Sequence, residues 1–280
     1  MAIRIITDST SDIPIENQAA LDISIVPLSV IFEGKKYTDG IELKKEQFYE
    51  MLSHSATLPT TSQVNPDEFE GLFKSFIDAG DTVVGIFISS KLSGTYQSAV
   101  IAKNALGSDR IFIVDSKSAT FGLALLVYEA IKMRVGGASA EQIAAALTDL
   151  SDRVQFYAVV NTLKYLKMGG RLSSSAAILG GMLNIKPLVS IVDGEVKSVA
   201  KERGQKAAFA WILDKLKKEA PDTQYPVVAG HSNDPDVMED FITTITGAVN
   251  MERPVICEIG CVIGTHSGPG CVGLAYIPKS

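Results

Sequence analysis

Short apolar runs that stop abruptly at polar loops are the feature that most constrains the fold of this chain. Three such runs lie at 82–88, 111–114 and 227–229, and a fourth at 3–6 is apolar except for Arg4. Each is rich in β-branched residues and lacks an alternation of apolar and polar positions. This pattern predicts strands that are buried on both faces.

Helical segments with recognisable first turns lie between these runs. Asn65-Pro66-Asp67-Glu68 combines a capping residue, a first-turn proline and a glutamate that can complete a capping box. Ser139 with Gln142, and Asp234 with Pro235, begin helices in similar ways. Buried strands that alternate with helices predict an α/β fold, with a mainly parallel N-terminal sheet that has helices on both faces.

The second half of the chain has a different strand pattern. Asp193-Gly194 lies between the segments 188–192 and 195–199, and this dipeptide predicts a tight hairpin with these segments as its strands. We predict further strands at 155–161, 255–263 and 271–277, and helices at 163–168, 174–183 and 203–218. A hairpin beside other strands predicts a mixed sheet. We therefore expect two α/β domains, 1–152 and 153–280, with the ligand between them.

Composition argues against several classes of function. The 280 residues carry a net charge of −6, unlike a nucleic-acid binder or a protein held electrostatically on anionic lipid. The N-terminus turns polar too soon for a signal peptide, and no apolar run reaches the ~18 residues that span a bilayer. Three cysteines do not indicate a secreted disulfide framework. We expect a cytoplasmic protein that contacts a membrane at most transiently.

Clusters of hydroxyl side chains at predicted strand ends are the main sign of a binding site. Thr60-Thr61-Ser62 is one cluster, and Ser89-Ser90 with Ser93-Gly94-Thr95 is the other. Ligands of open α/β sheets bind at such ends, and hydroxyls beside helix N-termini suit a carboxylate. No glycine-rich nucleotide motif follows a strand, so we expect no cofactor. Single hydroxyls or carboxylates there, including Asp8, Asp12 and Asp115, are more typical of helix caps and loop organisers.

His266 is the histidine best placed for a ligand role. It lies in Gly264-Thr265-His266-Ser267-Gly268-Pro269-Gly270, which we predict to be a tight loop between two strands. With Cys257, Cys261 and Cys271 it has nearly the spacing of a zinc knuckle. A strand through Cys257 and Cys261 would separate these residues by ~13 Å, so we expect buried structural cysteines and no metal.

Other interpretations remain open from the residues alone. Ser93 and His266 could form the nucleophile and base of a serine-type acyl hydrolase or thioesterase, although no orienting carboxylate is identifiable. A regulatory or scaffold protein with an incidental cavity is a third possibility. The apolar segment 175–189 is typical of a core helix and strand, or leaves room for a long apolar ligand. Lys164, Lys167 and Arg171 form a basic cluster, either solvated or in contact with an acidic partner.

Six motifs together resemble the DegV family of bacterial fatty-acid-binding proteins. They are T-D-S-T-S-D at 7–12, T-S-Q at 61–63, I-S-S at 88–90 with L-S-G-T-Y at 92–96, L-K-M-G-G-R-L-S at 166–173, K-P at 186–187 with D-G at 193–194, and G-T-H-S-G-P-G at 264–270. The resemblance spans the chain. It implies a two-domain α/β fold that encloses one long-chain fatty acid, such as palmitate, stearate or oleate.

The resemblance also implies roles for individual residues. Thr61, Ser93 and His266 hold the fatty-acid carboxylate, and Ser62 and Gly94 support this cradle. The leading interpretation is therefore a lipid-binding carrier that is not an enzyme by itself.

Arg171 matches the family's arginine that is linked to a separate fatty-acid kinase. This kinase phosphorylates the presented carboxylate, and the acyl phosphate enters phospholipid synthesis. Two departures from the family pattern are Val64-Asn65, where Pro-Ser is usual, and Lys91, where glycine is frequent. Lys91 places a positive charge near the expected carboxylate cradle.

Overall fold

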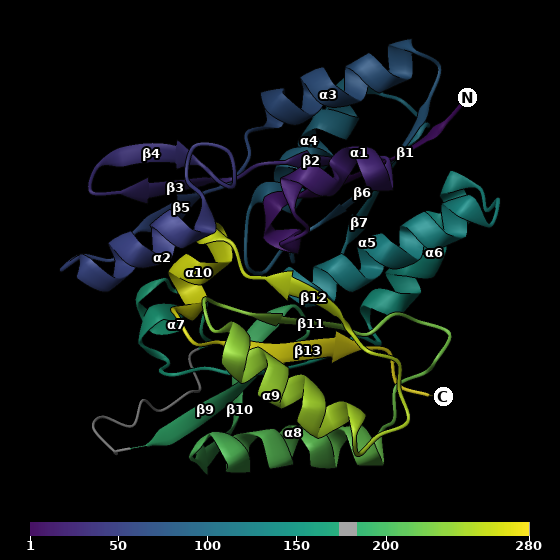
Figure 1. Ribbon diagram of the computed structural model, residues 1–280. Helices are drawn as coiled ribbons and strands as arrows, with labels where there is room; N and C mark the ends of the chain where they lie inside the picture. Colours follow the sequence, from purple (N-terminus) through teal and green to yellow (C-terminus); the bar gives the residue numbers. More distant parts are fainter. Residues whose placement is uncertain (174–183, 280) are drawn as a thin grey trace.

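The buried runs of the N-terminal half form a four-stranded parallel sheet, as their patterns predict (Figure 1). The structure is a computed structural model that describes residues 1–173 and 184–279. In spatial order the strands of this sheet are β2 (Ile23–Val26), β1 (Ile3–Asp8), β6 (Thr82–Phe87) and β7 (Ile111–Asp115). Because the strands are parallel, the polar loops that follow them meet at one edge of the sheet.

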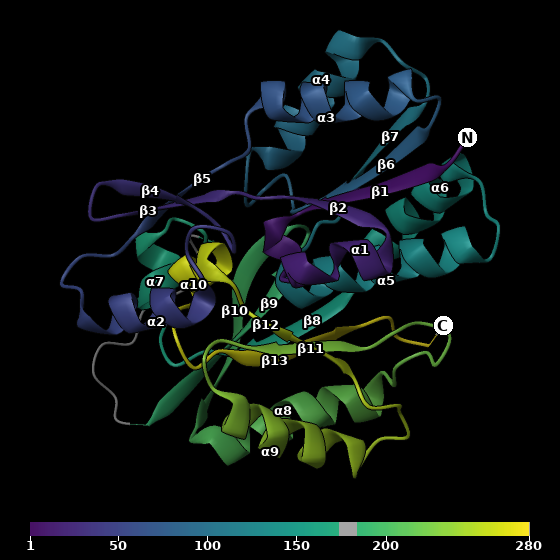
Figure 2. The ribbon, with the colours of Figure 1, turned by 45° about the horizontal axis from the view of Figure 1, so that its top comes forward.

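Helices cover both faces of the parallel sheet (Figure 2). One face carries α3 (Pro66–Asp78) and α4 (Thr95–Leu106), and the other carries α5 (Thr120–Val135) and α6 (Ala140–Ser151). Ser139 and Gln142 form the predicted capping box of α6. Pro66 begins α3 as predicted, although the Asn65 side chain makes no capping hydrogen bond.

The second large sheet has six strands and is mixed, as predicted. Its spatial order is β10 (Glu195–Arg203), β9 (Ile185–Val192), β8 (Gln155–Val159), β13 (Val272–Tyr276), β11 (Val228–His231) and β12 (Val255–Glu258). Only β11 and β12 pair in parallel. The predicted hairpin joins β9 to β10, and both Asp193 and Gly194 have positive φ, as a type I′ turn requires.

α5 lies between the two large sheets and packs against both. It contacts β1 and β6 of the parallel sheet and β11 and β13 of the mixed sheet (Figure 2). This position explains why α5 is apolar around most of its circumference. The far face of the mixed sheet is covered by α8 (Gln205–Lys218) and α9 (Pro235–Thr246).

A small antiparallel sheet in the N-terminal half was not predicted. Its strands are β4 (Lys35–Thr38), β3 (Ser29–Phe32) and β5 (Thr60–Ser62). Further helices are α1 (Gln18–Leu21), α2 (Lys45–His54) and α7 (Lys164–Met168), with 3₁₀ turns at Ser9–Ser11 and Ile15–Asn17. The small sheet matters for the site because β5 carries the T-S-Q segment.

The strand predicted at 255–263 is confirmed only for its first four residues, and the prediction of a loop around His266 was wrong. β12 ends at Glu258, and residues Cys261–Ser267 form helix α10. Gly260 precedes this helix, and Gly268, with φ near 70°, ends it. α10 packs against α2, β3 and β5 of the N-terminal half, so tertiary contacts outweigh its β-branched composition.

Two predictions about the middle of the chain have different outcomes. The helix predicted at 174–183 lies outside the described residues. The boundary predicted at 152/153 falls between α6 and β8. It stays a prediction, since α10 comes after it in the sequence but packs among elements that come before it.

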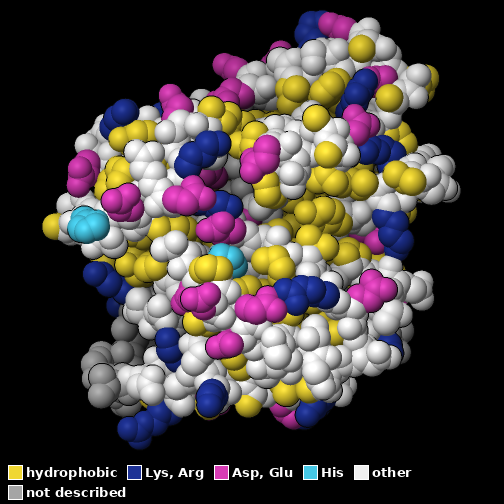
Figure 3. All heavy atoms as spheres, viewed as in Figure 1, with side chains coloured by type: hydrophobic (Ala, Val, Ile, Leu, Met, Phe, Trp, Pro, Cys, Tyr) yellow, Lys and Arg dark blue, Asp and Glu magenta, His cyan; other side chains and the backbone are white. Residues whose placement is uncertain are grey.

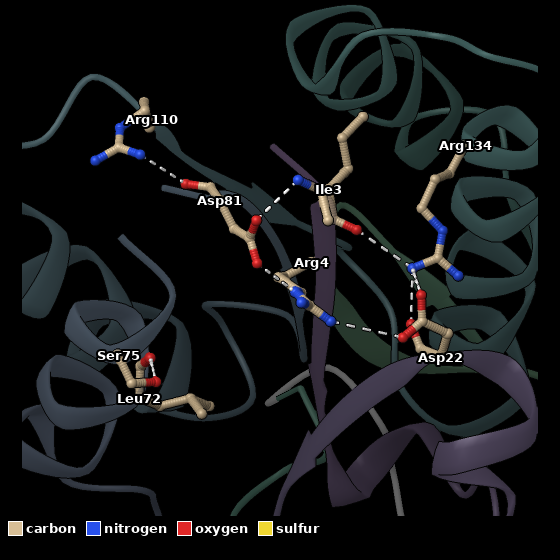
Figure 4. Close-up of polar contacts among 9 residues, drawn as sticks. Ile3, Arg4, Asp22, Leu72, Ser75, Asp81, Arg110 and Arg134 are labelled. Carbon is tan, nitrogen blue, oxygen red and sulfur yellow. Dashed lines mark hydrogen bonds and ion pairs between the residues drawn. The ribbon is translucent and has the colours of Figure 1, made fainter. Parts of the chain in front are cut away.

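Ion pairs lie at the end of the parallel sheet that is opposite the polar loops (Figure 4). Arg4 Nε lies 2.7 Å from Asp81 Oδ2, and Arg134 Nη1 lies 3.2 Å from Asp22 Oδ2.

Over the face of the molecule shown in Figure 3, charged side chains of both signs are interspersed with apolar side chains. In the described part of the chain, no helix is long and apolar enough to cross a membrane.

Candidate functional site

An apolar cavity lies between the two large sheets. Its space is about 990 Å³, including the solvent at its opening. The parallel-sheet side contributes Ile88 and the start of α5, and the mixed-sheet side contributes side chains of β8, β9 and β10. Phe121 and Phe156, both cavity-lining, stack with ring centroids 4.4 Å apart. Such a cavity suits a long apolar ligand.

Polar side chains gather at one part of the cavity wall. Thr61 Oγ1 lies 3.0 Å from His266 Nε2, and both residues line the cavity. Thr61 is brought there by the pairing of β5 with β3, and His266 by α10. Residues 205 positions apart in the sequence therefore form one hydrogen-bonded pair. The structure brings together two of the three residues that the family resemblance places at a carboxylate.

His266 is uncharged at neutral pH. Burial and, as the smaller effect, the nearby Arg171 guanidinium together lower the pKa of its imidazole to about 4. Nδ1 is buried and has no hydrogen-bond partner among the residues that the structure describes. A neutral ring protonated on Nε2 can donate to Thr61 Oγ1, which leaves the threonine O–H free for a ligand.

Gly169, at the end of α7, provides the space for the His266 ring. A Cβ at this position would overlap His266 Nδ1 and lie 3.1 Å from the Tyr165 carbonyl oxygen. Gly169, the first glycine of the G-G-R segment, therefore leaves the space that the His266 ring occupies. Sequence reasoning missed this role, since nothing local links Gly169 to a residue almost a hundred positions away.

Replacing Gly169 by alanine is expected to displace the His266 ring from its buried position. The pKa of His266 should then rise from about 4 toward its ordinary value of 6.5, because the burial that lowers it is lost. NMR titration of the three histidines measures this. Gly71→Ala in α3 is the matched control, since its Cβ would meet no atom within 4 Å. An unchanged His266 titration in Gly169→Ala would contradict the packing argument.

Ser93 lies on the same cavity wall but already has a local partner. Its Oγ accepts a hydrogen bond from the Thr95 N–H at 3.2 Å and lies 3.0 Å from Thr95 Oγ1. This is the helix-start role that such residues commonly have. A hydroxyl has two lone pairs and one proton, so Ser93 can still donate to a ligand.

Gly94 and Gln63 also line the cavity, whereas Ser62 does not. A Cβ at Gly94 would overlap the Gln63 carboxamide, which donates from Nε2 to Ser98 Oγ at 3.0 Å. Gln63 was not predicted as a site residue, although its T-S-Q motif was noted. Side chains alternate along β5, so Ser62 points away from Thr61, and its hydroxyl donates to the Gln63 carbonyl at 3.4 Å.

Arg171 is exposed and lies where the cavity meets the surface. Its Nε donates to the Leu92 carbonyl at 3.1 Å and its Nη1 to the Gly169 carbonyl at 2.7 Å. It therefore bridges the G-G-R loop and the loop that carries Ser93. Lys164 and Lys167, by contrast, are exposed and do not line the cavity.

Other predicted polar residues are structural. Asp8 accepts hydrogen bonds from the Thr10 and Ile88 backbone N–H groups, and Asp115 from those of Ser90 and Lys117, which confirms their role as loop organisers. Burial raises the pKa of Asp8 to about 6.

The cysteines are buried thiols, as predicted. The prediction that one strand runs through both Cys257 and Cys261 was wrong, since Cys257 lies on β12 and Cys261 begins α10. Burial raises the pKa of Cys257 and Cys271 to about 12, so neither is a thiolate at neutral pH. Among the described residues, no group of three or more histidine, cysteine or acidic side chains could hold a metal ion.

The geometry does not support the hydrolase alternative. His266 Nε2 lies against Thr61, whereas the Ser93 hydroxyl interacts with Thr95. Across residues 1–173 and 184–279, no carboxylate accepts a hydrogen bond from His266 Nδ1. A serine nucleophile needs a base in contact with it and a group that orients that base.

The comparisons with known proteins agree with the resemblance. The matching family model is that of an uncharacterised protein family, DegV, over residues 2–279. A DegV domain-containing protein of Caldanaerobacter subterraneus subsp. tengcongensis is 39% identical over 278 residues, which are 99% of each chain.

Solved structures of similar chains confirm the fold. A fatty-acid-binding DegV family protein of Thermus thermophilus has a TM-score of 0.90 and 32% identity, covering 99% of this chain and 100% of that one. A stearic-acid-binding protein of Eubacterium ventriosum has a TM-score of 0.87 and 29% identity, covering 100% and 99%.

Proposed function

The chain belongs to the DegV family, and we propose that it binds one long-chain fatty acid in the cavity between its two large sheets. The observation that carries this proposal is a cavity that is apolar along most of its wall and polar at Thr61, Ser93 and His266. Fatty-acid binding by similar solved proteins supports it. We propose that these three residues hold the fatty-acid carboxylate.

Burial of the acyl chain supplies most of the affinity. Each buried methylene contributes ~0.8 kcal/mol, so ~14 methylenes contribute ~11 kcal/mol before the cost of association. A hydrogen bond to the charged carboxylate adds about 1.5 to 3 kcal/mol. The cavity wall therefore retains the lipid, and the polar residues set its orientation.

We further propose that the protein presents the carboxylate to a separate fatty-acid kinase and is not an enzyme by itself. Arg171 supports this part, because it is exposed at the opening of the cavity and beside the proposed carboxylate position. Guanidinium groups chelate phosphate and carboxylate with paired hydrogen bonds. The acyl phosphate formed would then supply phospholipid synthesis.

Ser93→Ala is expected to weaken binding of a fatty acid by roughly 10- to 100-fold, through loss of one hydrogen bond to a charged group. A fatty alcohol of equal length should lose less affinity, since it has no charge at this position. Ser90→Ala, which removes an exposed neighbouring hydroxyl outside the cavity wall, is the matched control. Equal losses for acid and alcohol, measured by calorimetry, would overturn the assignment of Ser93 to the carboxylate.

Arg171→Ala is expected to keep full lipid occupancy and to lower kinase-coupled acyl-phosphate formation by about tenfold or more, the effect of losing one charge-assisted contact. Occupancy and turnover are measured on the same preparation. Lys167→Ala, an exposed cation of α7 outside the cavity wall, is the control. Lost occupancy or unchanged turnover would remove Arg171 from the proposed transfer step.

A further inference from the structure

Asp12 and Asp39 are buried carboxylates that the lipid cavity does not explain. They are 7% and 3% exposed. Within the described ranges, neither forms an ion pair with a lysine or arginine. A buried carboxylate without a cation is costly unless hydrogen-bond donors stabilise it. The identity of those donors therefore indicates what the two residues do.

Both carboxylates accept hydrogen bonds from backbone N–H groups at the start of α10. Asp12 Oδ1 lies 3.0 Å from the Gly260 nitrogen, and Asp39 Oδ1 lies 3.2 Å from the Cys261 nitrogen. The first N–H groups of a helix have no partner within the helix, and they attract negative charge. Asp12 lies at the end of the polar loop after β1, and Asp39 follows β4. Residues from the N-terminal half of the chain therefore bind the start of a helix from the C-terminal half.

α10 carries cavity-lining residues, among them Val262 and His266. A third contact fastens the same segment, because the Tyr49 hydroxyl of α2 donates to the Ile259 carbonyl at 2.9 Å. Figure 1 shows α10 beside α2 and the small sheet. In a helix this short, the position of the first turn determines where a residue near its end lies.

We propose that Asp12 and Asp39 are positioning residues for the lipid carboxylate, which hold the start of α10 and so keep His266 against Thr61. This inference rests on the proposed function. It assigns a task to the side chain of the second aspartate of the T-D-S-T-S-D motif, since the contact of Asp12 within its own loop is made by its backbone N–H, which donates to the Ser9 carbonyl. Neither aspartate is proposed to touch the lipid.

The test compares variants that lack the side-chain hydrogen-bond acceptor at position 12 or 39 with a variant that keeps it. Asp12→Ala and Asp39→Ala remove the acceptor, so the His266 titration without lipid should move up toward 6.5. The affinity for a fatty acid should fall about tenfold, and that for the matching alcohol by less. Asp12→Asn keeps a side-chain oxygen in place and should restore both properties.

Asp81→Ala is the matched control. Asp81, shown in Figure 4, is a 6% exposed carboxylate that accepts a hydrogen bond from the backbone N–H of Ala2, at the start of the chain. It should lower stability without changing the His266 titration or the preference for acid. Should the alanine variants fail to fold, Gly260→Ala replaces them, since its Cβ would lie 3.1 Å from Asp12 Oδ1 and push the two apart.

An unchanged His266 titration in the aspartate variants would overturn the inference, and so would equal losses of acid and alcohol binding. Failure of the wild-type protein to bind any fatty acid would instead overturn the proposed function. The titration without lipid would still test whether the two aspartates position His266, so the two failures are distinguishable.

Discussion

Replacing Phe121 by alanine is expected to lower the free energy of unfolding of the lipid-free protein by about 3 to 5 kcal/mol, the range for a buried phenylalanine. Phe121 is fully buried and lies between Phe156 and Gly230. Its removal also enlarges the cavity. The preference among saturated fatty acids should therefore shift toward longer chains, as measured by competition with mass-spectrometric detection.

Phe73→Ala separates these two effects. Phe73 is equally buried, but it belongs to the core between α3 and the parallel sheet and does not line the cavity. It should lose similar stability with no change in chain-length preference. A shift in preference in both variants, or in neither, would contradict the assignment of Phe121 to the wall of the acyl-chain site.

Removal of the lipid is expected to lower stability by about 4 kcal/mol relative to protein with free fatty acid at a thousandfold excess over Kd, because the ligand binds only the folded chain. Urea unfolding of delipidated and reloaded protein measures this difference. Butyrate at the same concentration is the control, since it has the carboxylate but little chain to bury. Equal midpoints for all three samples would contradict binding in the cavity.

Much of the fold could be predicted from the sequence because it depends on local patterns. Buried parallel strands are marked by continuous apolar runs, and the hairpin by Asp193-Gly194, whose conformation few other residues adopt easily. The capping box at Ser139 is equally local.

Helix α10 could not be predicted in this way. Residues 261–267 contain three β-branched residues and a glycine, all weak helix formers. The contacts that favour a helix come from Asp12, Asp39 and Tyr49, more than 200 positions earlier. No local pattern contains that information.

The candidate site also combines residues that local patterns predict with residues whose roles depend on distant contacts. Thr61, Ser93 and His266 were predicted from hydroxyl clusters, a glycine-rich flank and the family resemblance, and they line one cavity wall. Gly169 was missed as the residue that makes room for the His266 ring, because its effect is steric and acts across the fold. Gln63 was missed because its contact with Ser98 depends on how β5 meets α4.

Native mass spectrometry of the purified protein, before and after reloading with oleate, tests the central claim most directly. We expect a mass increase of one long-chain fatty acid per chain, and a smaller loaded fraction at the same limiting ligand concentration when Thr61, Ser93 and His266 are all replaced by alanine. Solvent extraction should release the same acid. A wild-type protein that carries no lipid after reloading, or a triple variant loaded as fully as the wild type, would contradict it.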